Sequence, residues 1–240
     1  MHPTQRERNN EEGIPKSGMN EADRANGRES SRKGEWSEGI KTHLAELPER
    51  WALALLYNFF LLTSLALAGL LLWKKKEFFS ALYVLFSFQH FSMDFLLGVG
   101  SALLFLSLLY FLHKLHVVDL PENRYTRLLL YLVSKPFGPF LLSFTSSISE
   151  ELLFRGFSLP FLATFIGPWL SLLIIALLFM ALHIPQYGKR AIIHLFIFFV
   201  GTMLGLLFFW RETLWAPIFA HFFYNLVSSF WMRKLFRINN

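Results

Sequence analysis

The chain has 240 residues, of which 54% are hydrophobic, carries a formal net charge of +6 and contains no cysteine. The apolar share exceeds the roughly 45–50% of soluble domains, and the lack of cysteine excludes disulfides, thiolate metal sites and a cysteine nucleophile. After residue 50 the basic residues lie mostly between apolar runs. This is typical of membrane-flanking loops and not of a nucleic-acid-binding groove, so no nucleic-acid partner is expected.

The first 50 residues are polar and rich in Glu, Arg, Asn, Gly and Ser. Such a segment buries too little apolar surface to fold alone, so we predict a disordered tail over residues 1–50. No basic segment leads directly into a short apolar run with a small-residue cleavage site. We therefore expect no cleaved signal peptide.

An uncharged run of 23 residues, 51–73, is the first predicted membrane span. Arg50 precedes it, three lysines follow it at 74–76, and tryptophans stand at both of its ends. Basic residues and tryptophans are the usual anchors at the membrane interface. The run therefore has both the length and the flanks of a transmembrane helix.

The second apolar stretch, 78–112, is interrupted by polar residues at positions 89, 90 and 94. The pattern fits either one tilted span preceded by an interfacial helix or a hairpin of two short spans, and 95–112 is the clearer helix. Asp94 is expected to cap the helix that follows it, because Asp is favoured at helix N-termini.

The rest of the chain alternates apolar helices with polar or proline-containing breaks. A polar connection covers 113–127, and a short interfacial segment, 128–133, is ended by prolines and glycine. The remaining predicted spans are 140–162, 168–183, 191–210 and 213–232. These elements predict an all-α fold, a polytopic transmembrane helix bundle of six spans, or of seven if 78–91 crosses.

The loops between the predicted spans give the bundle an orientation. The connection 113–137, the pair at 189–190 and the C-terminal tail carry most of the basic residues after the first span. All three fall on one side of the membrane under either count. Since basic loops face the cytoplasm, we predict a cytoplasmic C-terminus, with the N-terminal tail inside for six spans and outside for seven.

Charged residues inside membrane spans are rare and are functional hypotheses by default. Three of them fall within one six-residue stretch that contains Glu150, Glu151 and Arg155. Glu151 and Arg155 are four residues apart, so they share a helix face and can pair. Glu150 projects about 100° around the helix from its neighbour, which leaves its carboxylate free to act as a general base. The alternative is an ion-paired kink that only packs helices.

Two further motifs that contain histidine occur in later spans. Phe179 and His183 end one predicted helix, and His221 and Asn225 lie four residues apart in the last helix. The side chains of His221 and Asn225 point the same way and could converge on one atom. The chain reverses around 163–167, so Glu150 and His183 would reach a similar depth on antiparallel neighbouring helices.

Together the patterns E-E-x-x-x-R, F-x-x-x-H and H-x-x-x-N, each on its own apolar helix, resemble the CAAX-protease and bacteriocin-processing family. Its members are relatives of the type II CAAX prenyl endopeptidase, the Ras-converting enzyme. The resemblance covers roughly 140–232. It implies an intramembrane endopeptidase in which Glu150 activates water, His183 and His221 hold that water or a metal, and Asn225 stabilises the oxyanion. Glu151 and Arg155 would form the supporting pair.

This resemblance divides the chain into three regions. Residues 1–50 are the polar tail, 51–137 are the N-terminal transmembrane helices with their connecting loop, and 138–240 are a catalytic core of four helices with a short basic tail. The resemblance leaves two chemistries open. A divalent metal such as zinc could be held by Glu150, His183, His221 and Asn225 in a metalloendopeptidase, or the same residues could act without metal.

The resemblance also implies the surroundings of the protein. The expected partners are the lipid bilayer and a membrane-associated peptide or protein, prenylated in the CAAX-like case. A multi-pass protein of this kind would lie in the plasma membrane of a bacterium or the endoplasmic reticulum of a eukaryote. Two alternatives remain: a catalytically idle relative that binds peptides or chaperones membrane partners, and a small ion or metal transporter.

Overall fold

The computed structural model describes residues 50–117, 123–188 and 190–235, and every regular element within these ranges is a helix. The all-α prediction is confirmed for this part of the chain. The tail predicted for residues 1–50 lies outside the described residues, apart from Arg50.

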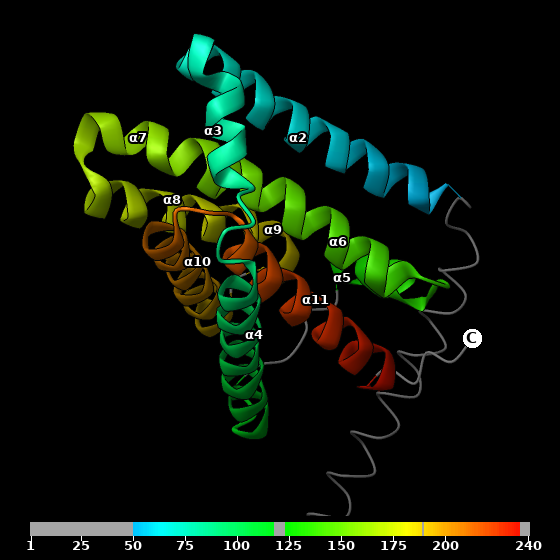
Figure 1. Ribbon diagram of the computed structural model, residues 1–240. Coiled ribbons are helices and arrows are strands. Elements are labelled where there is room, and N and C mark those ends of the chain that lie inside the picture. Colours follow the sequence, from blue (N-terminus) through cyan, green and yellow to red (C-terminus); the bar gives the residue numbers. More distant parts are fainter. Residues whose placement is uncertain (1–49, 118–122, 189, 236–240) are drawn as a thin grey trace, which may run out of the picture. The chain divides into compact units, whose positions relative to one another are not determined.

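The N-terminal helices settle how the stretch 78–112 is built. Helix α2 (Trp51–Lys74) leads through a 3-10 turn, η1 (Lys75–Glu77), into the short helix α3 (Phe78–Leu85), and α4 (Phe91–Lys114) follows. Figure 1 shows α3 turning back from the end of α2. At about 1.5 Å per residue, the eight residues of α3 are too short to cross a hydrocarbon core of about 30 Å. The seven-span alternative, which required a crossing there, is not supported.

The expected cap at Asp94 is wrong. Helix α4 begins at Phe91 with His90 at the N-cap position and without any side-chain cap, so Asp94 lies inside its first turn. Its carboxylate instead binds Arg211 and Thr213, more than a hundred residues later in the chain.

The second half of the chain forms the remaining helices. They are α5 (Arg124–Ser134), α6 (Gly138–Glu151), the π-helix η2 (Leu152–Ser158), α7 (Leu159–Ile166), α8 (Pro168–Leu182), α9 (Ile184–Tyr187), α10 (Ala191–Arg211) and α11 (Trp215–Leu235). The axis bends by 117° between α5 and α6. Helices α6, η2 and α7 run on without a break, and Gly167, with a φ of 81° that favours glycine, turns the chain back into α8.

The helices pack so that α11 lies between α4 and α6. Helix α2 packs along α6 and η2, and α8 packs against both α7 and α10 (Figure 1). Buried apolar side chains from α2, α4, η2, α8, α10 and α11 form one contiguous core. Among the helices that carry the polar motifs, η2, α8 and α11 form part of this core, and α6 packs against it through Ile148.

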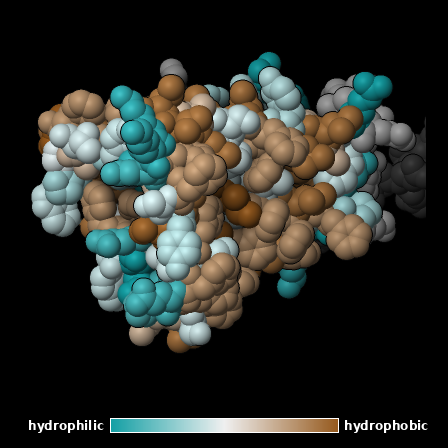
Figure 2. Space-filling model, turned by 45° about the horizontal axis from the view of Figure 1, so that its top comes forward, coloured by the Kyte–Doolittle hydropathy of each residue, from teal (hydrophilic) through white to brown (hydrophobic). Residues whose placement is uncertain are grey.

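The described residues contain three helical segments that are long and apolar enough to cross a membrane: 51–85, α4 and α10. A fourth is added if the bent pair formed by α5 and the run 138–166 counts as one span. The six predicted spans correspond in position to α2, α4, the continuous run 138–166, α8, α10 and α11. Of these, α8 has only 15 residues, and α11 contains polar side chains in its middle. Much of the face in Figure 2 is hydrophobic. The protein is an integral membrane helix bundle.

Candidate active site

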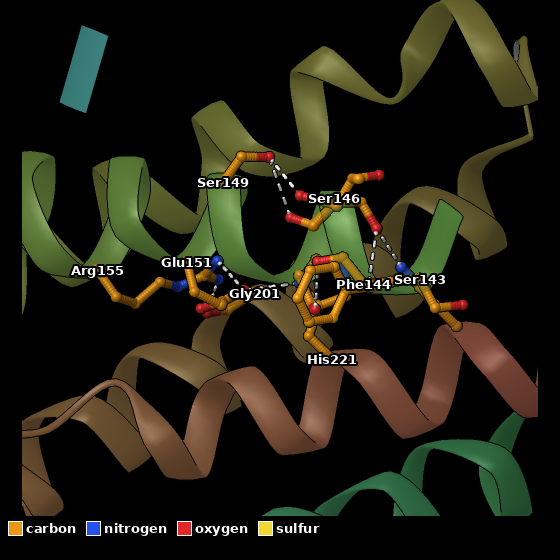
Figure 3. Close-up of polar contacts among 11 residues, drawn as sticks. Ser143, Phe144, Ser146, Ser149, Glu151, Arg155, Gly201 and His221 are labelled. Carbon is orange, nitrogen blue, oxygen red and sulfur yellow. Dashed lines mark hydrogen bonds and ion pairs between the residues drawn. The ribbon is translucent and has the colours of Figure 1, made fainter. Parts of the chain in front are cut away.

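The acidic motif lies where α6 passes into the π-helix. Glu151 and Arg155 are both fully buried, and Arg155 Nη1 donates to Glu151 Oε1 at 3.0 Å. Arg155 Nη2 also donates to the carbonyl oxygen of Gly201 on α10, at 2.9 Å. The contact expected from their spacing is thus present, and a buried pair of this kind is tolerated because each charge has a partner (Figure 3).

The π-helix starts directly after Glu151 and contains Arg155. A π-helical turn widens the helix by one residue per turn, and such turns are frequent at functional sites. Periodicity in the sequence does not reveal it, because the apolar pattern of 152–158 fits an ordinary α-helix equally well. This irregular turn carries the arginine that ties α6 to α10.

His221 on α11 completes a buried three-residue cluster. Its Nδ1 lies 2.7 Å from the same Glu151 oxygen, Oε1, that accepts from Arg155 (Figure 3). Because an ionised carboxylate can only accept a hydrogen bond, Nδ1 carries the proton. In the neutral imidazole the other ring nitrogen, Nε2, is then the one with the lone pair. Glu151 therefore orients the imidazole of His221 in one tautomer.

His183 is oriented in the same way by a different acceptor. It directly follows α8, is partly buried, and its Nδ1 lies 2.8 Å from the carbonyl oxygen of Phe179. A carbonyl also only accepts, so Nε2 of His183 is again the nitrogen with the free lone pair. Both histidines can thus accept a hydrogen bond from water.

Phe179 links the three motifs. Its ring lies 4.8 Å from the ring of His183 and 6.1 Å from that of His221, measured between centroids. The guanidinium of Arg155 lies 4.7 Å from the centre of the same ring. The sequence showed Phe179 only as the first residue of the F-x-x-x-H motif. In the structure its ring is in contact with residues of all three motifs.

The contact between η2 and α8 agrees with the expectation that Glu150 and His183 lie at a similar height along neighbouring antiparallel helices. The rings of Phe154 and Phe179 are in edge contact, with centroids 5.3 Å apart. Glu150 lies four residues before Phe154, and His183 lies four residues after Phe179. On antiparallel helices these positions reach a similar level.

Asn225 makes a contact that the sequence did not indicate. Its Nδ2 donates to Ser146 Oγ on α6 at 3.1 Å. His221 and Asn225 thus bind different residues of α6, Glu151 and Ser146. Their convergence on one substrate atom stays a prediction. Ser146 and Glu150 are four residues apart and share a face of α6. Asn225 is thereby held on the Glu150 side of that helix.

Glu150 itself has no close partner. Its side chain is partly buried, and no hydrogen bond or ion pair engages it among the described residues. It does interact electrostatically with Arg155 and His221. Of the two adjacent glutamates, Glu151 binds both Arg155 and His221 through Oε1, while its Oε2 is buried without a hydrogen-bond partner among the described residues. Glu150 has an available carboxylate.

Comparison with known proteins agrees with this arrangement. The family model for "Type II CAAX prenyl endopeptidase Rce1-like" matches residues 132–227, which include all three motifs. This part of the chain is similar to that family. A curated protein of Bacillus subtilis (strain 168), "Uncharacterized protein YpbD", is 32% identical over 83 residues. That stretch covers 35% of this chain and about two fifths (39%) of the relative's length. No solved structure matches the chain significantly.

A metal ion held by the Rce1-like motifs would need several ligands within reach of one point. Among residues 50–117, 123–188 and 190–235, no group of three or more His, Asp or Glu side chains could hold a metal ion. His221 Nδ1 and Asn225 Nδ2 are engaged by α6, whereas Nε2 of His221 stays open. Because no three such side chains come together among the described residues, the arrangement does not fit a metal, and the chemistry below is derived without one.

Removing the Arg155 side chain is expected to lower the stability of the folded protein. The change Arg155→Ala leaves Glu151 buried beside His221 alone, and breaking a buried ion pair costs about 3–5 kcal/mol. Thermal unfolding in detergent should therefore shift to lower temperature, whereas Arg127→Ala, at an exposed arginine on α5, should not. The double change Glu151→Gln with Arg155→Gln should recover part of the loss. An Arg155→Ala protein as stable as Arg127→Ala would contradict the pairing.

Proposed function

We propose that this protein is an intramembrane endopeptidase that hydrolyses a peptide bond with water activated by Glu150. The observation that supports it best is the contrast between the two adjacent glutamates. Glu151 is held by Arg155 and His221, while Glu150 keeps an available carboxylate in a partly buried position. A carboxylate in such a place can accept a proton during a reaction.

The proposed reaction follows from the free atoms of the site. Glu150 takes one proton from water, while Nε2 of a histidine accepts a hydrogen bond from the O–H that remains. The hydroxide attacks the carbonyl carbon of the substrate, and the carbonyl electrons move to its oxygen. Asn225 has a second N–H bond beyond the one given to Ser146, and it would donate to this oxyanion. The proton on Glu150 then passes to the leaving amine as the peptide bond breaks.

The proposed substrate is a membrane-associated peptide or protein, prenylated in the CAAX-like manner. The motifs lie on α6, α8 and α11, inside a bundle whose described residues include three helical segments long and apolar enough to cross a membrane. A soluble chain would have to leave water to reach them, whereas a lipid-anchored segment is already concentrated in the bilayer. The similarity of residues 132–227 to the Rce1-like family agrees with a prenylated substrate.

The direct test uses purified protein in lipid vesicles and two matched peptides. One carries a farnesylated cysteine followed by three residues, and the other has the same sequence without the lipid. Cleavage after the modified cysteine is expected, unchanged by a chelator. Cleavage that the chelator abolishes and added zinc restores would replace the metal-free mechanism with a metalloendopeptidase. Cleavage of neither peptide would favour an idle relative.

The orientation in the membrane is a separate proposal with its own test. The basic loop at 188–190 and the C-terminus should both lie in the cytoplasm, because basic loops are retained there. Reporter fusions that are active on only one side of the membrane should both read as cytoplasmic in whichever membrane, plasma or endoplasmic reticulum, holds the protein. A C-terminal reporter outside the cytoplasm would overturn the orientation.

A further inference from the structure

Asp94 forms a buried ion pair far from the acidic motif in sequence. Its side chain is fully buried on α4, and its Oδ1 accepts from Arg211 Nε at 2.5 Å. Its second oxygen, Oδ2, accepts from the hydroxyl of Thr213 at 2.9 Å. Arg211 is the last residue of α10, and Thr213 lies in the short connection between α10 and α11. A single carboxylate therefore holds both the end of α10 and the connection that leads into α11.

Two more contacts hold the same connection. The backbone N–H of Leu214 donates to the carbonyl oxygen of Leu85 at 2.8 Å, which joins the connection to the end of α3. The side chain of Leu214 is fully buried beside Gly156 of the π-helix, where an added Cβ would lie 3.3 Å from Leu214 Cδ1. The connection is thus attached to α4, to α3 and to the helix that carries the acidic motif.

The first turns of α11 are also pressed against α4. Gly98 lies one turn after Asp94, and a Cβ added there would come within 2.8 Å of the carbonyl oxygen of Ala216. It would also lie 3.1 Å from the backbone nitrogen of Ala220, the residue before His221. Small residues allow helix backbones to approach this closely in membranes. The contacts at Asp94 and Gly98 therefore fix where the N-terminal end of α11 lies against α4. The proposed active-site residues His221 and Asn225 follow directly after this fixed end.

We propose that Asp94 is a positioning residue of the active site, acting through Arg211 and Thr213 to hold His221 and Asn225 against α6. A charge-assisted hydrogen bond suits this role because its geometry is directional, and it adds to the close packing at Gly98. The effect on kcat rests on the proposed function. The positioning of α11 itself can be measured by cross-linking, which needs no enzymatic activity.

The activity-independent test uses the absence of native cysteine. The changes Ser146→Cys and Asn225→Cys replace two side chains that are in contact at 3.1 Å. A short bifunctional thiol reagent should cross-link them efficiently in otherwise wild-type protein, and more slowly when Asp94→Ala is added. Glu212→Gln is the matched control, because it removes an exposed carboxylate from the same connection. An unchanged cross-linking rate with Asp94→Ala would overturn the proposal.

The kinetic test compares kcat with KM for the farnesylated peptide. Asp94→Ala should lower kcat by roughly ten- to a hundredfold with KM nearly unchanged, because small misplacements of reacting groups have effects of this size. Should Asp94→Ala fold poorly, Asp94→Asn with Arg211→Gln leaves no lone buried charge. That double variant should fold at normal yield and still show the low kcat. A folded double variant with wild-type kcat would overturn the proposal. A wild type that cleaves no peptide refutes the proposed function instead, and the cross-linking result still stands.

Discussion

Replacing Glu150 with glutamine is expected to abolish peptide cleavage while leaving the protein folded. Glutamine keeps the size and hydrogen-bonding capacity of the side chain but cannot take a proton from water. No hydrogen bond or ion pair among the described residues engages Glu150, so its replacement removes no such contact from the fold. Cleavage of the farnesylated peptide and thermal unfolding of the same preparation measure the two effects.

The adjacent residue supplies the control. The same chemical change at Glu151 removes the carboxylate that binds both Arg155 and His221, so Glu151→Gln should lower the unfolding temperature as well as activity. The two substitutions should therefore separate loss of chemistry from loss of structure. Near-normal turnover by Glu150→Gln would show that Glu150 is not the general base.

A large loss of kcat is also expected on removing Asn225. If its amide donates to the oxyanion, Asn225→Ala should lower kcat by about 10²–10³-fold. KM should change little, because the oxyanion exists only after attack. His221→Ala should lose at least as much, since it removes both the water-holding nitrogen and a partner of Glu151.

The contact between Asn225 and Ser146 makes this prediction specific. If Asn225 only braces α11 through that hydrogen bond, Ser146→Ala should lower kcat as strongly as Asn225→Ala does. If Asn225 acts on the oxyanion, Ser146→Ala should have a much smaller effect. Asn225→Asp adds a second distinction, because a carboxylate would repel the oxyanion in a metal-free site. Chelator-sensitive activity in Asn225→Asp would indicate a metal instead.

Sequence reasoning predicted the features that depend on local spacing. The pair formed by Glu151 and Arg155 follows from a separation of four residues, and the turn at Gly167 and the start of α8 follow from Gly-Pro at 167–168. The helical class and the broken helix around 85–91 likewise follow from apolar runs and the residues that interrupt them. All of these are set within a few residues of the chain.

The features that were missed depend on contacts between distant segments. His221 binds Glu151 across 70 positions, and Asp94 binds Arg211 across 117. No periodicity encodes such pairs, so Asp94 was predicted to cap a helix, and the contact of His221 with Glu151 was not predicted. The π-helix after Glu151 was missed for another reason, because helical types share the same apolar pattern over seven residues.

The most direct test of the account is hydrolysis in water enriched in oxygen-18. Wild-type protein in vesicles should convert the farnesylated peptide into a product whose new carboxyl group carries one heavy oxygen, detected by mass spectrometry. Glu150→Gln, prepared in parallel, should yield no such product. A wild-type reaction without labelled product, or equal labelled product from Glu150→Gln, would contradict a peptidase that activates water through Glu150.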